Sequence, residues 1–219
     1  MSYILNIETA TKNCSVALAK DGNTVLCKEL STEGFSHAEK LHVFIEEIIA
    51  ETEISINDLN AIAVSSGPGS YTGLRIGVSA AKGLSFSLNI PLISVDTLTS
   101  LANQVLFFDG FIIPMIDARR MEVYSAVFNS NKEIIRKVEA EILNEDSFNE
   151  IVEKIYFIGD SNEKAKAILN KSNFVFLDEI KYPSAKEMSS LSYKKFLENN
   201  FEDVAYYEPY YLKDFMFAK

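Results

Sequence analysis

The sequence contains no tryptophan, only two cysteines and two histidines, and no long apolar run. No stretch approaches the ~18 apolar residues that a membrane-spanning helix needs. The first apolar segment has no basic residue ahead of it and is interrupted by Glu8, so we predict no secretory signal and expect a cytoplasmic protein with no membrane partner. Cys14 and Cys27 flank a predicted turn at Asp21-Gly22-Asn23 and match no metal-binding spacing. Reduced, partly buried thiols are therefore favoured over a disulfide.

Basic residues are also scarce, and the net charge is −10 over 219 residues. Most affinity for a nucleic-acid backbone comes from lysine and arginine, so this chain is a poor candidate for holding RNA alone and can contact it only locally. Two interpretations of the acidity stay open: the chain binds a basic protein, or the charge serves solubility alone. Hydrophobic residues make up 47% of the sequence, which is enough for a sizeable core.

The order of the predicted elements indicates a duplicated α/β fold. Strands are expected at 3–7, 14–19, 25–30, 61–65 and 92–95, then at 111–116, 122–128, 133–139, 155–158 and 174–177. Helices are expected at 37–50, 72–87 and 97–105, then at 146–152, 162–169 and 184–197. Ser36 and Glu39 form a capping box at the start of the first helix. Each half therefore follows the order β-β-β-α-β-α-β-α.

This order predicts two similar lobes, residues 1–108 and 109–219, each a mixed sheet with helices on its faces. Duplicated lobes of this kind define the actin and sugar-kinase superfamily, the ribonuclease H-like or ASKHA fold. Its members hold ATP with a glycine-containing hairpin after the first strand of each lobe, and an acidic residue commonly ends that strand. An actin-like small-molecule kinase or ATPase is therefore one function to weigh.

The two equivalent hairpins in this sequence contain no glycine. Glu8 and Thr9 begin the first hairpin, and Asp117 and Arg119 lie in the second. Without glycine the backbone amides cannot approach a phosphate freely, so we interpret these four residues as degenerate nucleotide-cleft positions. Glu8 either binds an ion or caps its turn, and the cap is favoured. Asp117 with Arg119 and Arg120 either holds an anion or forms a local ion pair.

A second glycine-bearing segment, SSGPGSYTGLRIG at 65–77, has the spacing of neither a dinucleotide fingerprint nor a Walker loop. Gly67, Pro68 and Gly69 are predicted to form a structural loop, with Arg75 as its anchor. We therefore interpret the segment as a tight strand-to-helix junction.

Three small residues follow this turn at intervals of four: Gly73, Gly77 and Ala81. On a helix they share one face, and a face without side chains lets another helix approach closely. The sequence leaves open whether that second helix belongs to the same lobe or to another protein.

The two histidines, His37 and His42, are five positions apart. On a helix they lie ~140° apart, so they cannot share a metal as an i, i+4 pair does, and a metalloprotease is not favoured. We expect no metal, no cofactor and no catalytic residue, because no motif supplies an activated nucleophile.

Several motifs resemble one family. The stretches ILNIETATKNCSVAL, SSGPGSYTGLRIGVSAAKGL, SVDTLTSLA and IDARRMEVY are similar to those of the TsaB family, the dimerisation subunits of the bacterial machinery that makes threonylcarbamoyladenosine in tRNA. The segment 207–213 resembles the closing Pro-x-Tyr-Leu-Arg of that family. Glu8 stands where many relatives have Asp, and Lys213 where many have Arg.

The resemblance implies a non-catalytic partner of TsaD, the subunit that transfers the threonylcarbamoyl group to the tRNA adenosine beside the anticodon. It implies a heterodimer scaffold that supports binding of TsaE, a homodimer when the chain is alone, and contact with tRNA only through the complex. The implied interface is formed by the helices at 37–50 and 72–87. The expected interface residues are His37, Leu41, Phe44, Ile45, Ile48, Gly73, Leu74, Gly77, Val78 and Ala81. The apolar residues of the first helix spread over more than one face, which fits either a partner or deep burial in this chain.

Overall fold

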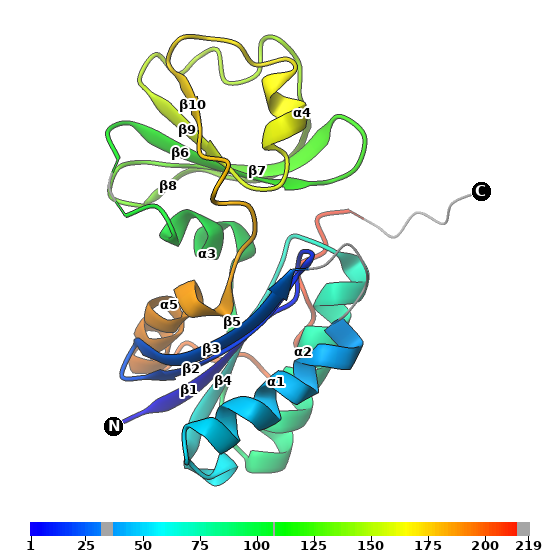
Figure 1. Cartoon of the computed structure of the whole chain (residues 1–219), viewed down its shortest axis with the longest axis vertical. Helices are drawn as coiled ribbons and strands as arrows, with labels where there is room; N and C mark the ends of the chain where they lie inside the picture. The colour runs from blue at the N-terminus through cyan, green and yellow to red at the C-terminus, as the bar shows by residue number, and fades with distance from the viewer. Residues whose placement is uncertain (32–36, 107, 214–219) are drawn as a thin grey trace, which may run out of the picture. The chain divides into compact units, whose positions relative to one another are not determined.

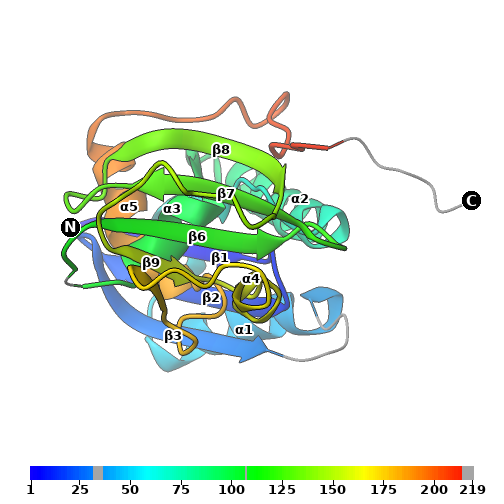
Figure 2. The same cartoon turned by 90° about the horizontal axis from the view of Figure 1, so that it is seen from above.

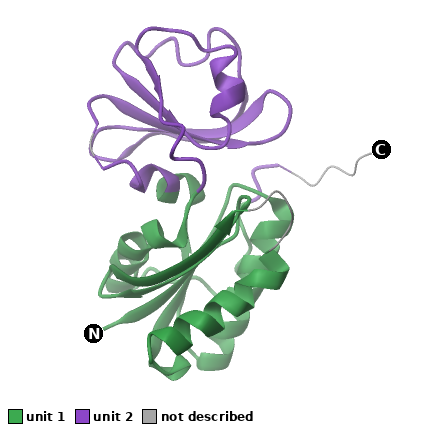
Figure 3. Cartoon of the chain, viewed as in Figure 1, with its two compact units in different colours: residues 1–100, 183–210 green, residues 101–182, 211–219 purple. Residues whose placement is uncertain are grey.

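The computed structural model describes residues 1–31, 37–106 and 108–213, and the chain divides into two compact units (Figure 3). Unit 1 consists of Met1–Ser100 and Pro183–Tyr210, and unit 2 of Leu101–Tyr182 and Tyr211–Lys219. In the described ranges, no helix has the length and apolar character needed to cross a membrane. The predicted capping residue Ser36 lies outside the described residues.

Unit 1 is built on a five-stranded mixed sheet (Figure 1). The strands have the order β3-β2-β1-β4-β5, with β1 antiparallel to β2 and parallel to β4. The elements are β1 (Tyr3–Glu8), β2 (Asn13–Lys20), β3 (Asn23–Ser31), α1 (His37–Glu51), η1 (Ile56–Asp58), β4 (Leu59–Ser65), α2 (Tyr71–Leu88), β5 (Leu92–Val95), α3 (Thr97–Asn103), which runs on into unit 2, and α5 (Ala185–Leu197).

Helices cover both faces of this sheet (Figures 1 and 2). On one face, Leu41 and Ile48 of α1 and Ala81 of α2 share a fully buried core with Leu5 and Ile7 of β1. On the other face, α5 packs its own apolar residues on the opposite side of the same strands. The buried residues of this second core are Ile4, Ala17, Ala61, Ala63, Ile93, Val95, Ala185 and Met188.

Unit 2 repeats the sheet. The elements are β6 (Phe111–Asp117), β7 (Glu122–Phe128), β8 (Ile134–Ile142), β9 (Ile155–Ile158), α4 (Asn162–Lys166) and β10 (Phe174–Phe176). The strand order β10-β9-β6-β7-β8 is that of unit 1 counted from the other edge, with β6 antiparallel to β7 and parallel to β9. The predicted duplication is therefore present at the level of strand order and direction.

Two details differ from the sequence prediction. The helix expected at 146–152 is wrong: residues 146–150 form successive turns, and Phe148, which is buried in the core of unit 2, has a left-handed φ of 62°. The expected division at 108/109 also differs from the observed units, because α5 belongs with unit 1. Ala185 and Met188 bury their side chains on the first sheet, and Ser192 Oγ donates a hydrogen bond of 2.7 Å to Asn6 Oδ1 of β1.

Candidate functional site

The junction between β4 and α2 is tight because two other parts of unit 1 press against its backbone. Gly67 has a φ of 105°, and a Cβ there would lie 2.6 Å from the carbonyl oxygen of Tyr210. Tyr210 N in turn donates to Ser66 O at 2.7 Å. Gly67 therefore allows both the left-handed turn and the close approach of the segment after α5.

The remaining glycines of the junction accommodate the turn that follows β1. A Cβ on Gly69 or Gly73 would lie far inside van der Waals contact of the backbone of Ala10 or Thr9, and a Cβ on Gly77 would collide with Thr9 Oγ1. Thr9 Oγ1 donates a hydrogen bond of 2.8 Å to Gly73 O. The smooth face of α2 is thus filled from within the same lobe by the turn at Thr9 and Ala10.

This packing closes the N-terminus of α2. Ser70 N donates to Ala10 O at 2.6 Å, and the Ser70 side chain caps the helix by accepting from Gly73 N at 3.3 Å. A helix N-terminus binds phosphate through free backbone amides. Here the N-cap amide of Ser70 and the first-turn amide of Gly73 are engaged by oxygens of the chain itself, in agreement with the interpretation of the segment as a packing junction.

The expected interface residues are mostly internal, and their assignment to an intermolecular surface is corrected. The structure buries nine of the ten in unit 1: His37, Leu41, Ile45, Ile48, Gly73, Leu74, Gly77, Val78 and Ala81. Phe44 is half-buried against the same core. The reason is the 3.6-residue helical period: the strongest apolar stripe of each helix faces its own sheet, and an outer surface must lie on the opposite stripe.

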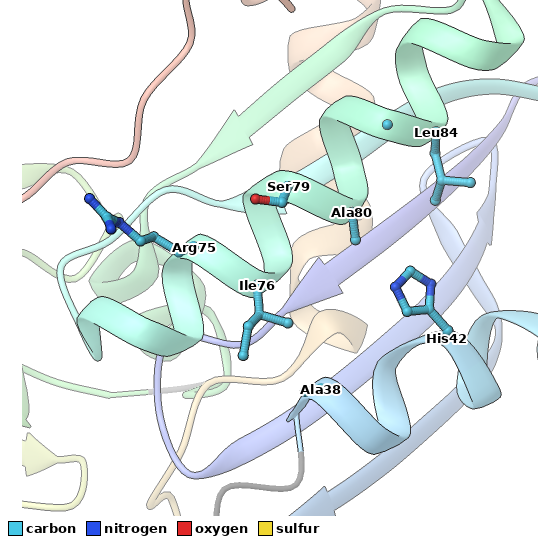
Figure 4. A pocket seen from close by; sticks show the side chains of 8 residues that line it. Ala38, His42, Arg75, Ile76, Ser79, Ala80 and Leu84 are labelled. Atoms are coloured by element: carbon cyan, nitrogen blue, oxygen red, sulfur yellow. The ribbon is translucent and has the colours of Figure 1, made fainter.

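The opposite stripes of α1 and α2 border a groove of about 620 Å³ (Figure 4). Figure 4 shows Ile76 and Ala80 of α2 pointing toward the side of α1 that carries Ala38 and His42. The groove is lined by Ala38, His42, Arg75, Ile76, Ser79, Ala80, Gly83 and Leu84. Arg75, expected to anchor the preceding loop, lies exposed on this face with its guanidinium 4.1 Å from the centre of the Tyr71 ring.

Sequence reasoning missed this groove although α2 carries a signal for it. Ile76, Ala80, Gly83 and Leu84 recur at helical spacing as a second apolar and small-residue stripe. Gly83 differs from the glycines of the junction, because a Cβ there would meet no atom of the described chain within 4 Å. No packing inside the described part of this chain therefore requires a glycine at that position.

The carboxylate of Glu8 is fully buried at the end of β1. Its Oε1 accepts from Ala10 N at 2.6 Å, which confirms the turn-capping interpretation, while Oε2 has no hydrogen-bond partner among the described residues. Burial is the main cause that raises the pKa of Glu8 to about 7; the Ala10 amide and the Ser65 side chain lower this pKa, and the nearby Asp96 carboxylate raises it. The Ser65 hydroxyl also lies 2.7 Å from the Thr97 hydroxyl.

In the second degenerate hairpin, between β6 and β7, the ionic partner of Asp117 is a lysine and neither arginine. The exposed Asp117 carboxylate forms an ion pair of 2.5 Å with Lys164 Nζ and accepts from Arg119 N at 2.9 Å. Asp117 is therefore paired with the lysine of α4, and its contact with Arg119 is through the backbone. Arg119 and Arg120 are both exposed.

The two histidines lie in different surroundings, as their spacing predicts. His37 is buried, and desolvation lowers its pKa, whereas His42 is exposed in the groove. Among the residues that the structure describes, no three His, Cys, Asp or Glu side chains gather where a metal ion can be held.

Comparison with known proteins identifies the family. Residues 34–215 match the family model described as TsaD, tRNA N6-adenosine threonylcarbamoyltransferase. The tRNA threonylcarbamoyladenosine biosynthesis protein TsaB of Escherichia coli is 31% identical, over 96% of this chain and 94% of that protein. The structure of YeaZ from Pseudomonas aeruginosa aligns with a TM-score of 0.82 and 25% identity, covering 97% of this chain and 100% of that one.

A more distant structure supports the fold alone. Component A of (R)-2-hydroxyglutaryl-CoA dehydratase from Acidaminococcus fermentans aligns with a TM-score of 0.51 at 11% identity, covering 89% of this chain and 99% of that one. The predicted fold class, two duplicated actin-like lobes, is confirmed by this likeness and by the two matching sheets. With its fold, motifs and nearly full-length relative in agreement, the chain belongs to the TsaB family.

Proposed function

We propose that this chain is a non-catalytic subunit of the machinery that forms threonylcarbamoyladenosine in tRNA, and that it acts by pairing with a TsaD protein. The E. coli relative is named as a tRNA threonylcarbamoyladenosine biosynthesis protein, which supports a role for this chain in the same pathway. The match to a TsaD family model over most of the chain supports descent from a common actin-like ancestor, so that two similar folds can pair. In this proposal TsaE binds the pair, and tRNA is held by the assembled complex.

The groove between α1 and α2 is the surface that we assign to the pairing. It combines half-buried apolar side chains, Ile76 and Leu84, with small residues at Ala80 and Gly83. Small residues allow two helix pairs to approach closely, and apolar area removed from water stabilises the contact by about 25 cal/mol per Å². The same groove accepts a second copy of this chain when no TsaD is present, which gives a homodimer.

The alternative, an actin-like kinase or ATPase, is less well supported. Such an enzyme needs a hairpin and a helix N-terminus whose backbone amides can bind phosphate. Here the amide of Ser70, at the start of α2, already donates to Ala10 O. The single observation that favours a scaffold is the open space at Gly83, in a groove that combines apolar and small residues with His42, Arg75 and Ser79.

Gly83→Arg tests the proposal. A Cβ at Gly83 would meet no atom of the described chain within 4 Å, so the fold is expected to survive while a long charged group fills the groove. We expect co-purification with the TsaD protein of the same organism to be lost, with affinity reduced at least tenfold, and the homodimer to dissociate in light scattering. Threonylcarbamoylation in a mixture with TsaD, TsaE, ATP and tRNA should fall in parallel.

Leu197→Arg is the matched control. Leu197 is 62% exposed at the end of α5, on the opposite face of the sheet from α1 and α2. The Leu197→Arg substitution places the same charged side chain on a helix that does not line the groove. TsaD binding should therefore stay at the level of the unchanged chain. Normal TsaD binding by Gly83→Arg would place the interface elsewhere, and threonylcarbamoylation by this chain without TsaD would contradict the scaffold role.

A further inference from the structure

The hairpin between β6 and β7 carries two adjacent arginines without an ionic partner. Arg119 and Arg120 are two of only four arginines in the sequence. Of the other two, Arg136 pairs with Glu141 and Arg75 stacks on Tyr71. Within the described part of the chain, the guanidinium groups of Arg119 and Arg120 form no ion pair and no hydrogen bond, and both residues are exposed. Neither arginine is therefore explained by packing or pairing inside this chain.

Two of the three neighbouring acidic groups are paired with lysines, and the third, Asp160, accepts from Asp117 N through Oδ1 at 2.8 Å. Lys164 Nζ pairs with Asp117 and also donates to the carbonyl oxygens of Arg120 and Glu122, at 3.1 and 2.6 Å. Lys213 pairs with the Glu122 carboxylate. No carboxylate of the described chain forms an ion pair with either arginine, although the whole chain carries a net charge of −10.

The backbone holds this pair in an unusual conformation. Arg119 has a φ of 72° and Arg120 a φ of 54°. In the described ranges they are the one case of two consecutive non-glycine residues with positive φ. A residue with a long side chain and a positive φ carries a conformational strain of order 1 kcal/mol, and asparagine or glycine at the same position reduces that strain. Such strain is retained where the side chains have a use, and Lys164 fixes the turn by its bonds to Asp117 and the two carbonyl groups.

We propose that Arg119 and Arg120 bind phosphate groups of an RNA backbone when this chain acts within its complex, an inference that rests on the proposed function. The guanidinium fork donates two parallel hydrogen bonds to a phosphate and stays charged at any physiological pH. An exposed hairpin tip suits a phosphodiester passing over it, whereas a free nucleotide usually needs a concave, enclosing site. The pair would supply local contact with tRNA from a chain whose overall charge repels it.

The double variant Arg119→Asn/Arg120→Gly separates charge from fold. Both new residues adopt positive φ at lower cost, so the melting temperature should stay the same or rise. We expect the complex of this variant with TsaD to bind tRNA about tenfold more weakly. The slope of log Kd against log salt should fall by roughly one to two, which corresponds to one or two lost phosphate contacts. Arg119→Lys/Arg120→Lys should retain most of the affinity.

Lys137→Ala/Lys171→Ala, which removes two exposed charges elsewhere on unit 2, is the control for net charge and should leave the slope unchanged. Unaltered tRNA affinity and slope in the Asn/Gly variant would overturn the inference. The inference would also be overturned if the complex of the Asn/Gly variant lost ATP binding but kept its tRNA affinity. The arginines would then bind the phosphate groups of a nucleotide and not those of RNA.

Co-purification with TsaD is measured on the same samples and reports the proposed function separately. If the unchanged chain does not bind TsaD, the proposed function is overturned, and the assignment of the arginines falls with it. If TsaD binds both the unchanged chain and the Asn/Gly variant while tRNA affinity stays unaltered, only the assignment of the arginines is overturned.

Discussion

Gly77→Arg is expected to unfold the first lobe, whereas Gly83→Arg on the same helix is expected to leave it folded. A Cβ at Gly77 would already collide with the Thr9 side chain, and the position is buried. Arginine there would also place a charge in an apolar core, which costs several kcal/mol without a partner. That loss is comparable with the 5–15 kcal/mol that stabilises a typical domain, so we expect insoluble protein.

Gly83 is the internal control for this prediction because it lies in open space on the same helix. Replacing glycine by arginine in a helix interior removes backbone freedom from the unfolded chain and is favourable by roughly 0.5–1 kcal/mol. Thermal unfolding followed by circular dichroism should therefore give Gly83→Arg an equal or higher melting temperature. A soluble Gly77→Arg protein with an unchanged melting temperature would show that the Thr9 turn does not need the glycine.

Glu8→Gln is expected to stabilise the protein above neutral pH. The pKa of Glu8 is raised from 4.5 to about 7, chiefly by burial, so the folded state holds a proton that the unfolded state releases above 4.5. Stability is therefore highest below that pH and falls as pH rises through 7. The loss reaches about 3 kcal/mol above pH 7, from 1.36 kcal/mol per pKa unit. Glutamine keeps the acceptor for Ala10 N and has no charge to bury.

The measurement is the melting temperature of both proteins between pH 5 and pH 8.5. The two curves should nearly coincide at pH 5 and separate with rising pH, by roughly 5–10 °C at pH 8 for a chain of this size. Asp96, whose pKa is also raised by burial, leaves a residual slope in both. Glu46→Gln, on the exposed side of α1, should follow the unchanged protein. Parallel curves for Glu8→Gln would mean that Glu8 is not the source of the pH dependence.

The sequence predicted the strands and the two main helices well, because each has a strong local signal. The expected span 72–87 lies within Tyr71–Leu88, and the strand at 92–95 has the observed bounds. The helix expected at 146–152 failed because Phe148 is buried with a left-handed backbone, a tertiary requirement that outweighs local preference. The placement of α5 failed for a related reason: a helical pattern does not say which sheet its apolar side will cover.

The candidate site was predicted at the level of elements and not of residues. The spacing of Gly73 and Gly77 correctly predicted tight packing but could not choose between a neighbour in the same lobe and one in another protein. Only the position of the Thr9 turn decides that question. Ranking residues by apolar character selected the core stripe of α1 and α2, since a core is more apolar than a partner-binding groove. The weaker stripe through Ile76, Ala80 and Leu84 was overlooked for that reason.

The return of residues 183–210 to the first unit has a consequence for how the chain is made. Met188 closes the core on one face of the first sheet, Glu202 N donates to Leu92 O, and Tyr210 N donates to Ser66 O. A ribosome must therefore synthesise unit 2 and residues 183–210 before unit 1 can complete its fold. Until then the apolar face later covered by α5 stays open to water, to chaperones and to other nascent chains. Unit 1 thus depends for its final stability on a segment that is translated after most of unit 2.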